Sequence, residues 1–431
     1  MEKVKIAMLG FGTIGRGVYK VMNDNRAYIT SNSGKVVELS RILVRPAEKD
    51  TDELRDNPVF TTDINDIIND GSLQIVIELM GGEQPATDFM LRALKAGKHV
   101  VTANKLALAK NGHVLLGTAR NVNLRFEYEA SVGGGIPIIR LINESFNANK
   151  AESIIGIING TSNYILSRMT KSGMDFDEAL KTAQKKGYAE ADPASDVGGH
   201  DAVYKLAIMS SLAFSTEVNY QDIYREGMDR VSAQDIKNAA RFGYVIKLLA
   251  IAREVDKKME LRVHPAMIPE DHPMANISGS YNAIYITGNA VDDIMISGKG
   301  AGSMPTASAV VSDVINIVKG QPPVPGVGEP RRRLAVIPIE ETLSRRYLCL
   351  RVADAPGVLA LIAAILGGRG VSISQMVQEQ IKSDEGAGSE ASLIFITHPT
   401  LEGSFCAAVR EILALDCVKE VSSNIRIEEF D

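Results

Sequence analysis

The first fifteen residues constrain the fold more than any other part of the sequence. Val4 to Leu9 is a short apolar run typical of a buried strand, and a helical pattern begins at Arg16. Between them stands a GxGxxG motif. Its first glycine makes a tight turn, its second lets the backbone approach a pyrophosphate, and its third lets helix and strand pack closely. The motif therefore predicts a dinucleotide-binding domain, and a purely structural glycine turn is the alternative. The predicted cofactor contacts are Gly10, Phe11, Gly12, Thr13, Ile14 and Gly15.

The end of the second strand bears on the choice of nicotinamide cofactor. This strand runs from Val36 to Val44, and Arg45 follows it where NAD-binding domains usually carry an acidic residue for the ribose hydroxyls. An arginine at this place can pair with a 2′-phosphate, which favours NADP over NAD. A solvated arginine after a strand is the alternative. The spacing from Gly15 to Arg45 is longer than usual, because residues 23–35 form a polar insertion.

Strands and helices alternate over the rest of the first 140 residues. Gln74 to Leu79 and His99 to Val101 have the composition of buried strands, and residues 86–96 have a helical pattern. This alternation predicts a parallel sheet, whose ligands bind beyond the carboxyl ends of its strands. The residues predicted at this cofactor mouth are Gly81, Thr102 and Lys105. An ordinary helix-start lysine is the alternative for Lys105, although the helix dipole disfavours a cation there.

Three consecutive glycines, 133–135, follow a predicted strand from Leu124 to Glu129. Glycine reaches backbone conformations that are closed to other residues. Carbonyl groups of such a turn can surround a hard cation, because hard cations prefer oxygen ligands. A strained turn into the next helix is the alternative.

The stretch from Ala183 to Lys205 (AQKKGYAEADPASDVGGHDAVYK) is the densest in chemically active side chains. Several carboxylates stand among turn-forming residues, and a helical pattern begins near Gly199. On that helix Asp201 and Lys205 are four residues apart and share one face. They form either a surface ion pair worth roughly 0.3 kcal/mol or part of a proton-transfer site. A partly desolvated lysine beside carboxylates can give and take a proton.

This stretch resembles the signature of the homoserine dehydrogenases. The matching positions are Ala183, Gly187, Tyr188, Ala189, Glu190, Asp192, Pro193, Asp196, Asp201 and Lys205. The resemblance extends to the sequences TANK (102–105) and NGTSNY (159–164), and it covers essentially the whole chain. It implies NAD(P)-dependent interconversion of L-homoserine and L-aspartate 4-semialdehyde in threonine, methionine and isoleucine biosynthesis.

The resemblance also implies roles for individual residues. Lys205 is the implied catalytic proton donor and acceptor, and Lys105 faces the reaction centre. Glu190 and Asp201 hold the amino and hydroxyl groups of homoserine, with support from Asp196. The implied lining of the substrate pocket is Asn159, Gly160, Thr161 and Tyr188. Further implied cofactor contacts are Gly187, Glu190 and Gly302. A sodium or potassium ion is implied at Glu129 and the carbonyls of Val132, Gly134 and Ile136.

The substrate half is predicted to mix helices and strands. Ile236 to Ala252 is predicted to be helical, and Met259 to Met267, Ala283 to Thr287 and Val291 to Ile296 alternate like strands of an antiparallel or mixed sheet that supports subunit contact. A helix from Thr306 to Val318 is predicted to return to the nucleotide domain.

A Pro/Gly-rich stretch at 320–330 is predicted to be a linker. The segments after it follow the order β-α-β-β-α-β of a ferredoxin-like unit, with a flexible hairpin loop at 382–390. This order and the DxPGVL turn resemble an ACT domain. The implied amino-acid effector is threonine, beside Asp354, Pro356, Gly357 and Val358. A plain oligomerisation module is the alternative, and pairing of the second and third domains predicts a homodimer or homotetramer.

Composition excludes several function classes. The net charge of −6 gives no basic footprint for nucleic acid. No apolar run is long enough to span a bilayer, and the absence of a signal peptide predicts a cytoplasmic location. The start of the chain predicts that no fused aspartate kinase precedes it. All three cysteines lie after residue 348, which argues against a phosphate-acylating semialdehyde dehydrogenase with a cysteine nucleophile. A nucleotide and amino-acid sensor without turnover is the alternative from another class.

The predicted fold class is therefore α/β. A Rossmann-type nucleotide domain spans 1–140 and is joined again by 303–320. An α+β substrate and dimerisation domain spans 141–320, a linker spans 321–346, and a ferredoxin-like ACT domain spans 347–431.

Overall fold

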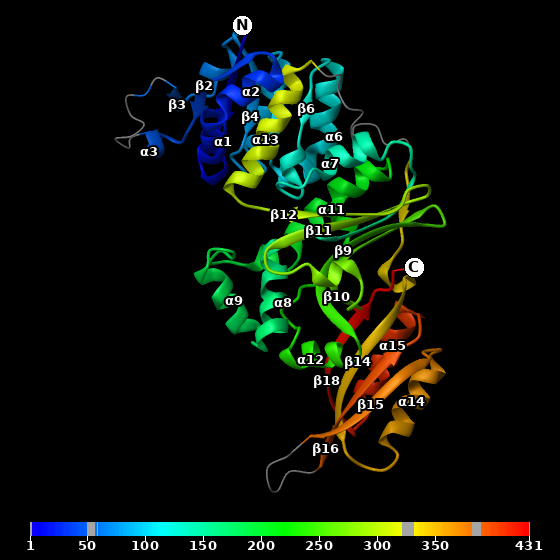
Figure 1. Cartoon of the computed structure of the whole chain (residues 1–431). Coiled ribbons are helices and arrows are strands. Elements are labelled where there is room, and N and C mark those ends of the chain that lie inside the picture. The colour runs from blue at the N-terminus through cyan, green and yellow to red at the C-terminus, as the bar shows by residue number, and fades with distance from the viewer. Residues whose placement is uncertain (1, 50–56, 58, 321–331, 382–388, 431) are drawn as a thin grey trace. The chain divides into compact units, whose positions relative to one another are not determined.

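The computed structural model describes residues 2–49, 57, 59–320, 332–381 and 389–430 (Figure 1). The chain forms two compact units, each assembled from three segments. Unit 1 comprises Met1–Gly160, Asp201–Ile223 and Ser280–Leu334, and unit 2 comprises Thr161–His200, Tyr224–Gly279 and Ala335–Asp431. Within the described ranges, no helix combines the length and apolar character needed to cross a membrane.

A six-stranded parallel sheet forms the centre of unit 1. Its order is β3-β2-β1-β4-β5-β6, which is the Rossmann order, and every pair is parallel. The predicted parallel sheet is thus confirmed. Its strands are β1 (Lys3–Leu9), β2 (Val36–Leu43), β3 (Phe60–Thr61), β4 (Leu73–Glu78), β5 (His99–Thr102) and β6 (Phe126–Glu127).

Helices cover this sheet. Helices α1 (Thr13–Asp24) and α13 (Ser303–Val318) lie side by side, although nearly 280 residues separate them in sequence (Figure 1). Their approach is close, because a Cβ added at Gly17 would lie 2.5 Å from Ser303 Oγ. Val18, Val310 and Val314 from these two helices join Ile6 and Met8 of β1 in one buried core. The other helices around the sheet are α2 (Arg26–Ser33), α5 (Ala86–Lys95) and α6 (Lys105–Asn121).

The rest of unit 1 combines an antiparallel strand group with one long buried helix. Strand β11 (Tyr281–Gly288) pairs with β7 (Ala151–Ile157) on one side and with β12 (Asp292–Lys299) on the other. Helix α11 (His200–Ala213) begins where the signature stretch ends, and eleven of its residues are buried.

In unit 2 the structure corrects one prediction. Residues 236–252 are not a single helix: helix α12 (Ala233–Arg241) ends before Gly243, and strand β9 (Tyr244–Val255) follows. Gly243 has φ +77°, a left-handed conformation that ends the helix. The apolar run after it pairs antiparallel along its whole length with β10 (Lys258–Pro269). This ladder satisfies the backbone polar groups of the run, and tertiary context decides such ambiguous apolar segments.

Unit 2 also contains α9 (Phe176–Lys185) and α10 (Ala194–Val197). Helix α8 (Gly160–Ser172) belongs to unit 2 as well, except for its first residue. Two short strands, β8 (Tyr224–Arg225) and β13 (Ala335–Val336), pair with β10. Residues 321–331 of the predicted linker at 321–346 lie outside the described residues, and residues 335–336 add a strand to β10.

The C-terminal part of unit 2 follows the order β-α-β-β-α-β. Its antiparallel sheet has the order β18-β14-β16-β15, and β18 also pairs in parallel with β10 at Ala266 and Met267. The elements are β14 (Leu343–Ala353), α14 (Val358–Gly368), β15 (Ile373–Ile381), β16 (Glu390–Thr397), α15 (Glu402–Leu413) and β18 (Val418–Ile427). Most of the loop predicted at 382–390 lies outside the described residues.

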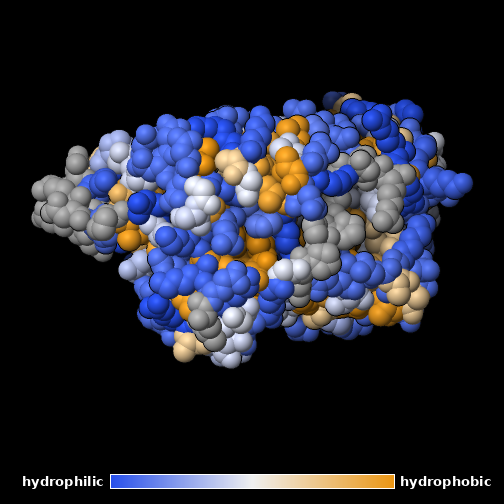
Figure 2. Space-filling model, turned by 90° about the horizontal axis from the view of Figure 1, so that it is seen from above, coloured by the Kyte–Doolittle hydropathy of each residue, from blue (hydrophilic) through white to orange (hydrophobic). Residues whose placement is uncertain are grey.

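The face of the molecule shown in Figure 2 is mostly hydrophilic, with small hydrophobic patches scattered between hydrophilic residues. Scattered apolar residues of this kind are ordinary on a protein surface.

Candidate functional site

A buried lysine–aspartate pair lies at the start of α11. Lys205 Nζ donates to Asp201 Oδ2 over 2.6 Å and to the carbonyl oxygen of Ile158 over 2.8 Å. Asp201 is 5% exposed and Lys205 is 7% exposed. The predicted helical face is therefore correct, and the surface-pair alternative is wrong, because both charges are removed from solvent.

Two further side chains hold the same carboxylate. Lys105 Nζ lies 2.8 Å from Asp201 Oδ1, and Asn159 Nδ2 donates to Asp201 Oδ2 over 2.9 Å. Burial alone would raise the pKa of Asp201, but the ammonium groups of Lys205 and Lys105 hold this pKa well below its usual range. Asp201 therefore stays ionised at any working pH. We call Lys105, Asp201 and Lys205 the lysine–aspartate site.

A buried network centred on Glu78 and Asn104, two residues for which the sequence predicted no role, lies beside Lys105. Asn104 caps α6 by accepting from the Ala107 amide over 3.1 Å, and its Nδ2 donates to the Gly82 carbonyl over 2.7 Å. Glu78 accepts from the Thr102 hydroxyl over 2.7 Å, and also from the backbone amides of Met80 and Gly81. Burial raises the pKa of Glu78. Two features of the sequence could have indicated this network: Asn104 is a polar residue at a helix start, and Glu78 is an acid at the end of an apolar strand.

The glycine turn after β1 has the shape of a dinucleotide site. Gly10 has φ +97°, and a Cβ at Gly15 would lie 2.5 Å from the Gly10 carbonyl oxygen, so both positions require glycine. A Cβ at Gly12 would meet no atom within 4 Å. Gly12 therefore faces open space at the first turn of α1, where no side chain caps the amides. These amides can bind a pyrophosphate.

The start of α13 lies beside this turn. Ser303 Oγ donates to the Thr13 carbonyl over 2.7 Å, and the preceding residue, Gly302, has φ +122°. The structure thus brings Gly302 next to the glycine turn. Gly81, with φ +73°, follows the end of β4, and Thr102 is the last residue of the neighbouring strand β5. Phe11 stacks edge-on against Phe60, and Ile14 packs on the core of the domain.

Arg45 follows β2 as predicted, and its side chain is exposed. Its guanidinium contacts Glu48 at 2.6 Å, and this contact raises the pKa of Arg45. An acid therefore stands beside the arginine that was predicted to bind a 2′-phosphate.

The predicted substrate residues of unit 2 gather around the start of α8. Thr161 Oγ1 donates to the Tyr188 carbonyl over 2.6 Å, and Ser162 Oγ donates to the Asp196 carbonyl over 3.0 Å. The side chain of Glu190 is exposed, and Gly187 has φ +74°. In unit 1, Gly160 lies against Ser280, because an added Cβ would be 2.9 Å from the Ser280 carbonyl oxygen.

The predicted cation site lies at a buried acid. Glu129 accepts from the backbone amides of Ile139 and Arg140, and burial raises its pKa to about 7. The Ile136 carbonyl already accepts from the Ile138 amide over 2.8 Å. Gly134 approaches Gly300 so closely that a Cβ would lie 2.7 Å from its carbonyl. Val132 is fully buried beside these groups. Across the described ranges, no group of three or more His, Cys, Asp or Glu side chains could hold a metal.

The predicted effector residues surround the start of α14. Asp354 accepts from Gln378 Nε2 and from Ser389 Oγ, both over 3.2 Å. Gly357 has φ +90°, Val358 is buried and Pro356 is exposed.

Comparison with known proteins decides the family. Residues 137–315 match the family model of homoserine dehydrogenase, and residues 10–129 match that of the homoserine dehydrogenase NAD-binding domain. The chain belongs to the homoserine dehydrogenase family. A homoserine dehydrogenase of Synechocystis sp. is 43% identical over 98% of this chain and 99% of its own length. That of Neisseria gonorrhoeae is 39% identical over the full length of both. The crystal structure of the enzyme from Thiobacillus denitrificans has a TM-score of 0.92 at 40% identity, covering 100% of this chain and 99% of that one.

The predicted enzyme class is thus confirmed: the chain is an NAD(P)-dependent oxidoreductase of the homoserine dehydrogenase family. The relatives reported above are named as an enzyme and match this chain over nearly their whole length. This match excludes the alternative of a sensor without turnover.

Proposed function

We propose that the lysine–aspartate site performs acid–base chemistry in reversible hydride transfer between L-homoserine and L-aspartate 4-semialdehyde. One observation carries this proposal: two lysines from different helices, Lys105 of α6 and Lys205 of α11, share the single buried carboxylate of Asp201. We place the reaction in the cytoplasm, in the biosynthesis of threonine, methionine and isoleucine.

Lys205 is the proposed proton donor and acceptor. In the direction of reduction it gives its proton to the substrate oxygen as negative charge develops there, and in oxidation it takes that proton back. When bound, the nicotinamide supplies or accepts the hydride. Asp201 orients Lys205 and stabilises its charged form, and Lys105 adds positive charge facing the same carboxylate.

The proposed substrate contacts are carboxylate, amide and hydroxyl side chains and one glycine. Glu190 and Asp201 hold the amino and hydroxyl groups of homoserine, and Asp196 supports them. Asn159, Gly160, Thr161 and Tyr188 line the pocket. The polar and glycine-rich character of these positions suits a small zwitterionic substrate, because such a ligand needs hydrogen-bond partners at close range.

The proposed nucleotide contacts are centred on the open space beside Gly12. The amides of the glycine turn hold the pyrophosphate, with Gly81, Thr102, Lys105, Gly187, Glu190 and Gly302 completing the site. NADP is the proposed preferred cofactor because Arg45 can reach a 2′-phosphate. Glu48 weakens this preference, because the 2′-phosphate of NADP must compete with the Glu48 carboxylate for the Arg45 guanidinium.

A sodium or potassium ion is proposed at Glu129 and the carbonyls of Val132, Gly134 and Ile136. The buried carboxylate supports this proposal, since a cation would offset the desolvation that raises its pKa. The C-terminal β-α-β-β-α-β unit is proposed to be an ACT domain that binds threonine beside Asp354 and gives feedback control. A homodimer or homotetramer is the proposed assembly.

The test is nicotinamide reduction with L-homoserine, run with NADP and NAD side by side on the full chain and on Lys205→Met. Lys95→Met is the matched control, because Lys95 is an exposed lysine at the end of α5. We expect turnover by the full chain and the control, and loss of turnover with retained nucleotide binding in Lys205→Met. Equal turnover in all three would contradict the role of Lys205.

A further inference from the structure

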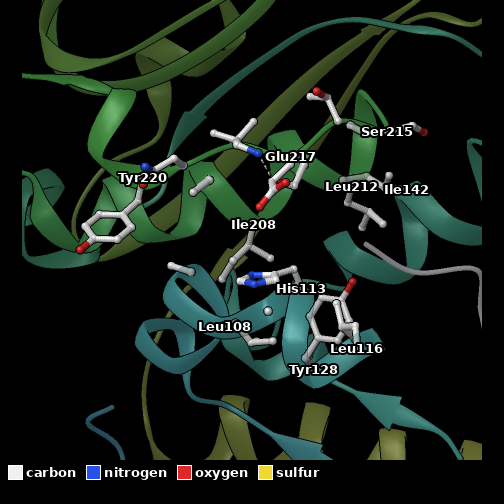
Figure 3. Close-up of a pocket in the computed structure, with 18 of the residues that line it drawn as sticks. Leu108, His113, Leu116, Tyr128, Ile142, Ile208, Leu212, Ser215, Glu217 and Tyr220 are labelled. Carbon is white, nitrogen blue, oxygen red and sulfur yellow. Dashed lines mark hydrogen bonds between the residues drawn. The ribbon is translucent and has the colours of Figure 1, made fainter. Parts of the chain in front are cut away.

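Unit 1 contains a cavity of about 1050 Å³ that the proposed reaction does not use. Helices α6 and α11 form two of its walls, and residues 142–149 and 215–221 complete it (Figure 3). No member of the lysine–aspartate site lines it. Its volume lies just above the range for small-molecule sites, about 300–1000 Å³, and is large for a substrate of homoserine's size. We call it the α6–α11 cavity.

The cavity lies on the same helices as the lysine–aspartate site. Leu108 follows Lys105 by three residues on α6, and Ile208 follows Lys205 by three residues on α11. Three residues advance an α-helix by about 4.5 Å. A molecule in the cavity therefore touches both helices less than one turn from the two lysines, without meeting either lysine.

One part of the cavity wall is apolar and includes the buried side chain of Tyr128. Leu108, Leu116, Ile142, Ile208 and Leu212 are each less than 10% exposed and line it together. Tyr128 lies among them at 5% exposure, and its hydroxyl has no hydrogen-bond partner among the residues that the structure describes. In Figure 3 this hydroxyl points toward the side where Ile142 and Leu212 lie. Buried polar atoms are almost always paired, so the hydroxyl indicates a missing partner.

Charge does not select an ion for this cavity. Lys110 in its lining is paired with Glu83 at 2.6 Å, and the lining also contains Glu217, His113 and Arg120. Acidic and basic side chains thus balance, and the remaining polar lining consists of neutral amide and hydroxyl side chains. An anion or a cation would meet a group of its own sign, whereas a neutral molecule would not.

We propose that the α6–α11 cavity binds a neutral small molecule with an apolar body and a carbonyl or hydroxyl oxygen that accepts from Tyr128, and that its occupancy changes turnover. The binding half is independent of the proposed function. The coupling half rests on the proposed function, because α6 and α11 carry the two lysines.

The probe is 4′-(trifluoromethyl)acetanilide, a neutral aromatic amide, and binding is followed by the fluorine NMR linewidth of the probe on the full chain. Trifluoromethylbenzene has the apolar body without the acceptor, and 4-(trifluoromethyl)benzoate adds a charge. Ala109→Trp fills the cavity from a half-buried position on its lining, and Tyr128→Phe removes only the hydroxyl. Lys205→Met separates binding from catalysis.

We expect the amide to bind at least fivefold more tightly than the benzoate. Ala109→Trp should abolish binding, and Tyr128→Phe should weaken the amide about fivefold while leaving trifluoromethylbenzene unchanged. Lys205→Met should bind the amide like the parent chain. A saturating amide should change kcat/KM for homoserine at least twofold in the parent chain and not in Ala109→Trp.

Several results would overturn the proposal. The first is an absence of line broadening with any probe, which would mean that the cavity holds water only. The second is probe binding that Ala109→Trp leaves intact, and the third is tighter binding of the benzoate than of the other probes. Probe binding that weakens as protein concentration rises would mean that a second copy covers the cavity. Binding without any change in kcat/KM would refute the coupling, and inactivity of the parent chain with intact probe binding would refute the proposed function instead.

Discussion

Alanine substitutions at two glycines of the nucleotide turn should separate cofactor binding from folding. At Gly12 the backbone has φ −74° and ψ −158°, which any residue adopts, and an added Cβ meets nothing within 4 Å. Alanine gains about 0.4–1 kcal/mol by restricting the unfolded chain but loses a similar amount as a poorer N-cap. The free energy of unfolding should therefore change by less than about 0.5 kcal/mol. The new methyl group occupies the space through which a pyrophosphate approaches the amides.

Loss of one charge-assisted hydrogen bond, worth about 1.5–3 kcal/mol, should weaken nucleotide binding roughly 10- to 100-fold. Gly15→Ala is the matched control, because its Cβ would lie 2.5 Å from the Gly10 carbonyl oxygen. Such overpacking costs about 1–3 kcal/mol of stability. NADPH and NADH fluorescence titrations measure binding, and thermal unfolding measures stability. Wild-type affinity in Gly12→Ala, or a greater loss of stability than in Gly15→Ala, would refute the assignment of the turn.

Three further predictions concern charged groups. Lys205→Met should lower kcat about 100- to 10,000-fold at unchanged nucleotide affinity, and stopped-flow turnover with homoserine checks this; a loss below tenfold would contradict it. Glu129 has a folded pKa of about 7 against 4.5 for the free side chain. The contribution of Glu129 to the free energy of unfolding is therefore fully present below pH 4.5, where the carboxyl is protonated. It is lost as pH rises through 7, and the total loss is about 3 kcal/mol. Glu129→Gln should flatten this dependence in denaturant unfolding, and sodium should stabilise only the parent chain above pH 7. Arg45→Gln should reduce the NADP to NAD preference in kcat/KM at least fivefold; an unchanged ratio would assign the preference elsewhere.

Features that depend on local pattern could be predicted from the sequence. The parallel sheet follows from strands that alternate with helices, and its order requires only short right-handed connections. The shared face of Asp201 and Lys205 follows from the period of the helix alone. The same reasoning failed at 236–252, where a long apolar run fits a helix and a strand equally well, and the pairing of β9 with β10 decides between them.

The composition of the lysine–aspartate site could be predicted only in part. Asp201 meets Lys105 and Asn159 through tertiary packing that brings α6, the end of β7 and α11 together, and no local pattern encodes such contacts. The support of Lys105 by Glu78 and Asn104 was missed for the same reason: each residue looked ordinary at its own element end. Whether Arg45 or Glu48 controls the 2′-phosphate position also depends on a side-chain contact that spacing does not reveal.

The placement of charge explains why these three groups belong together. Lys105 is the first residue of α6, where the helix dipole opposes a cation by about 0.3–1 kcal/mol. Asp201 lies in the first turn of α11, where the dipole favours an anion. The ion pair between Lys105 at the start of α6 and Asp201 lets this favoured carboxylate offset the disfavoured ammonium of Lys105, and the same carboxylate offsets the buried ammonium of Lys205. Two ammonium groups share one carboxylate, so the three side chains together carry a net charge of +1. A site that retains this charge stabilises an alkoxide more than a neutral carbonyl, and in the proposed function this difference would lower the barrier to reduction.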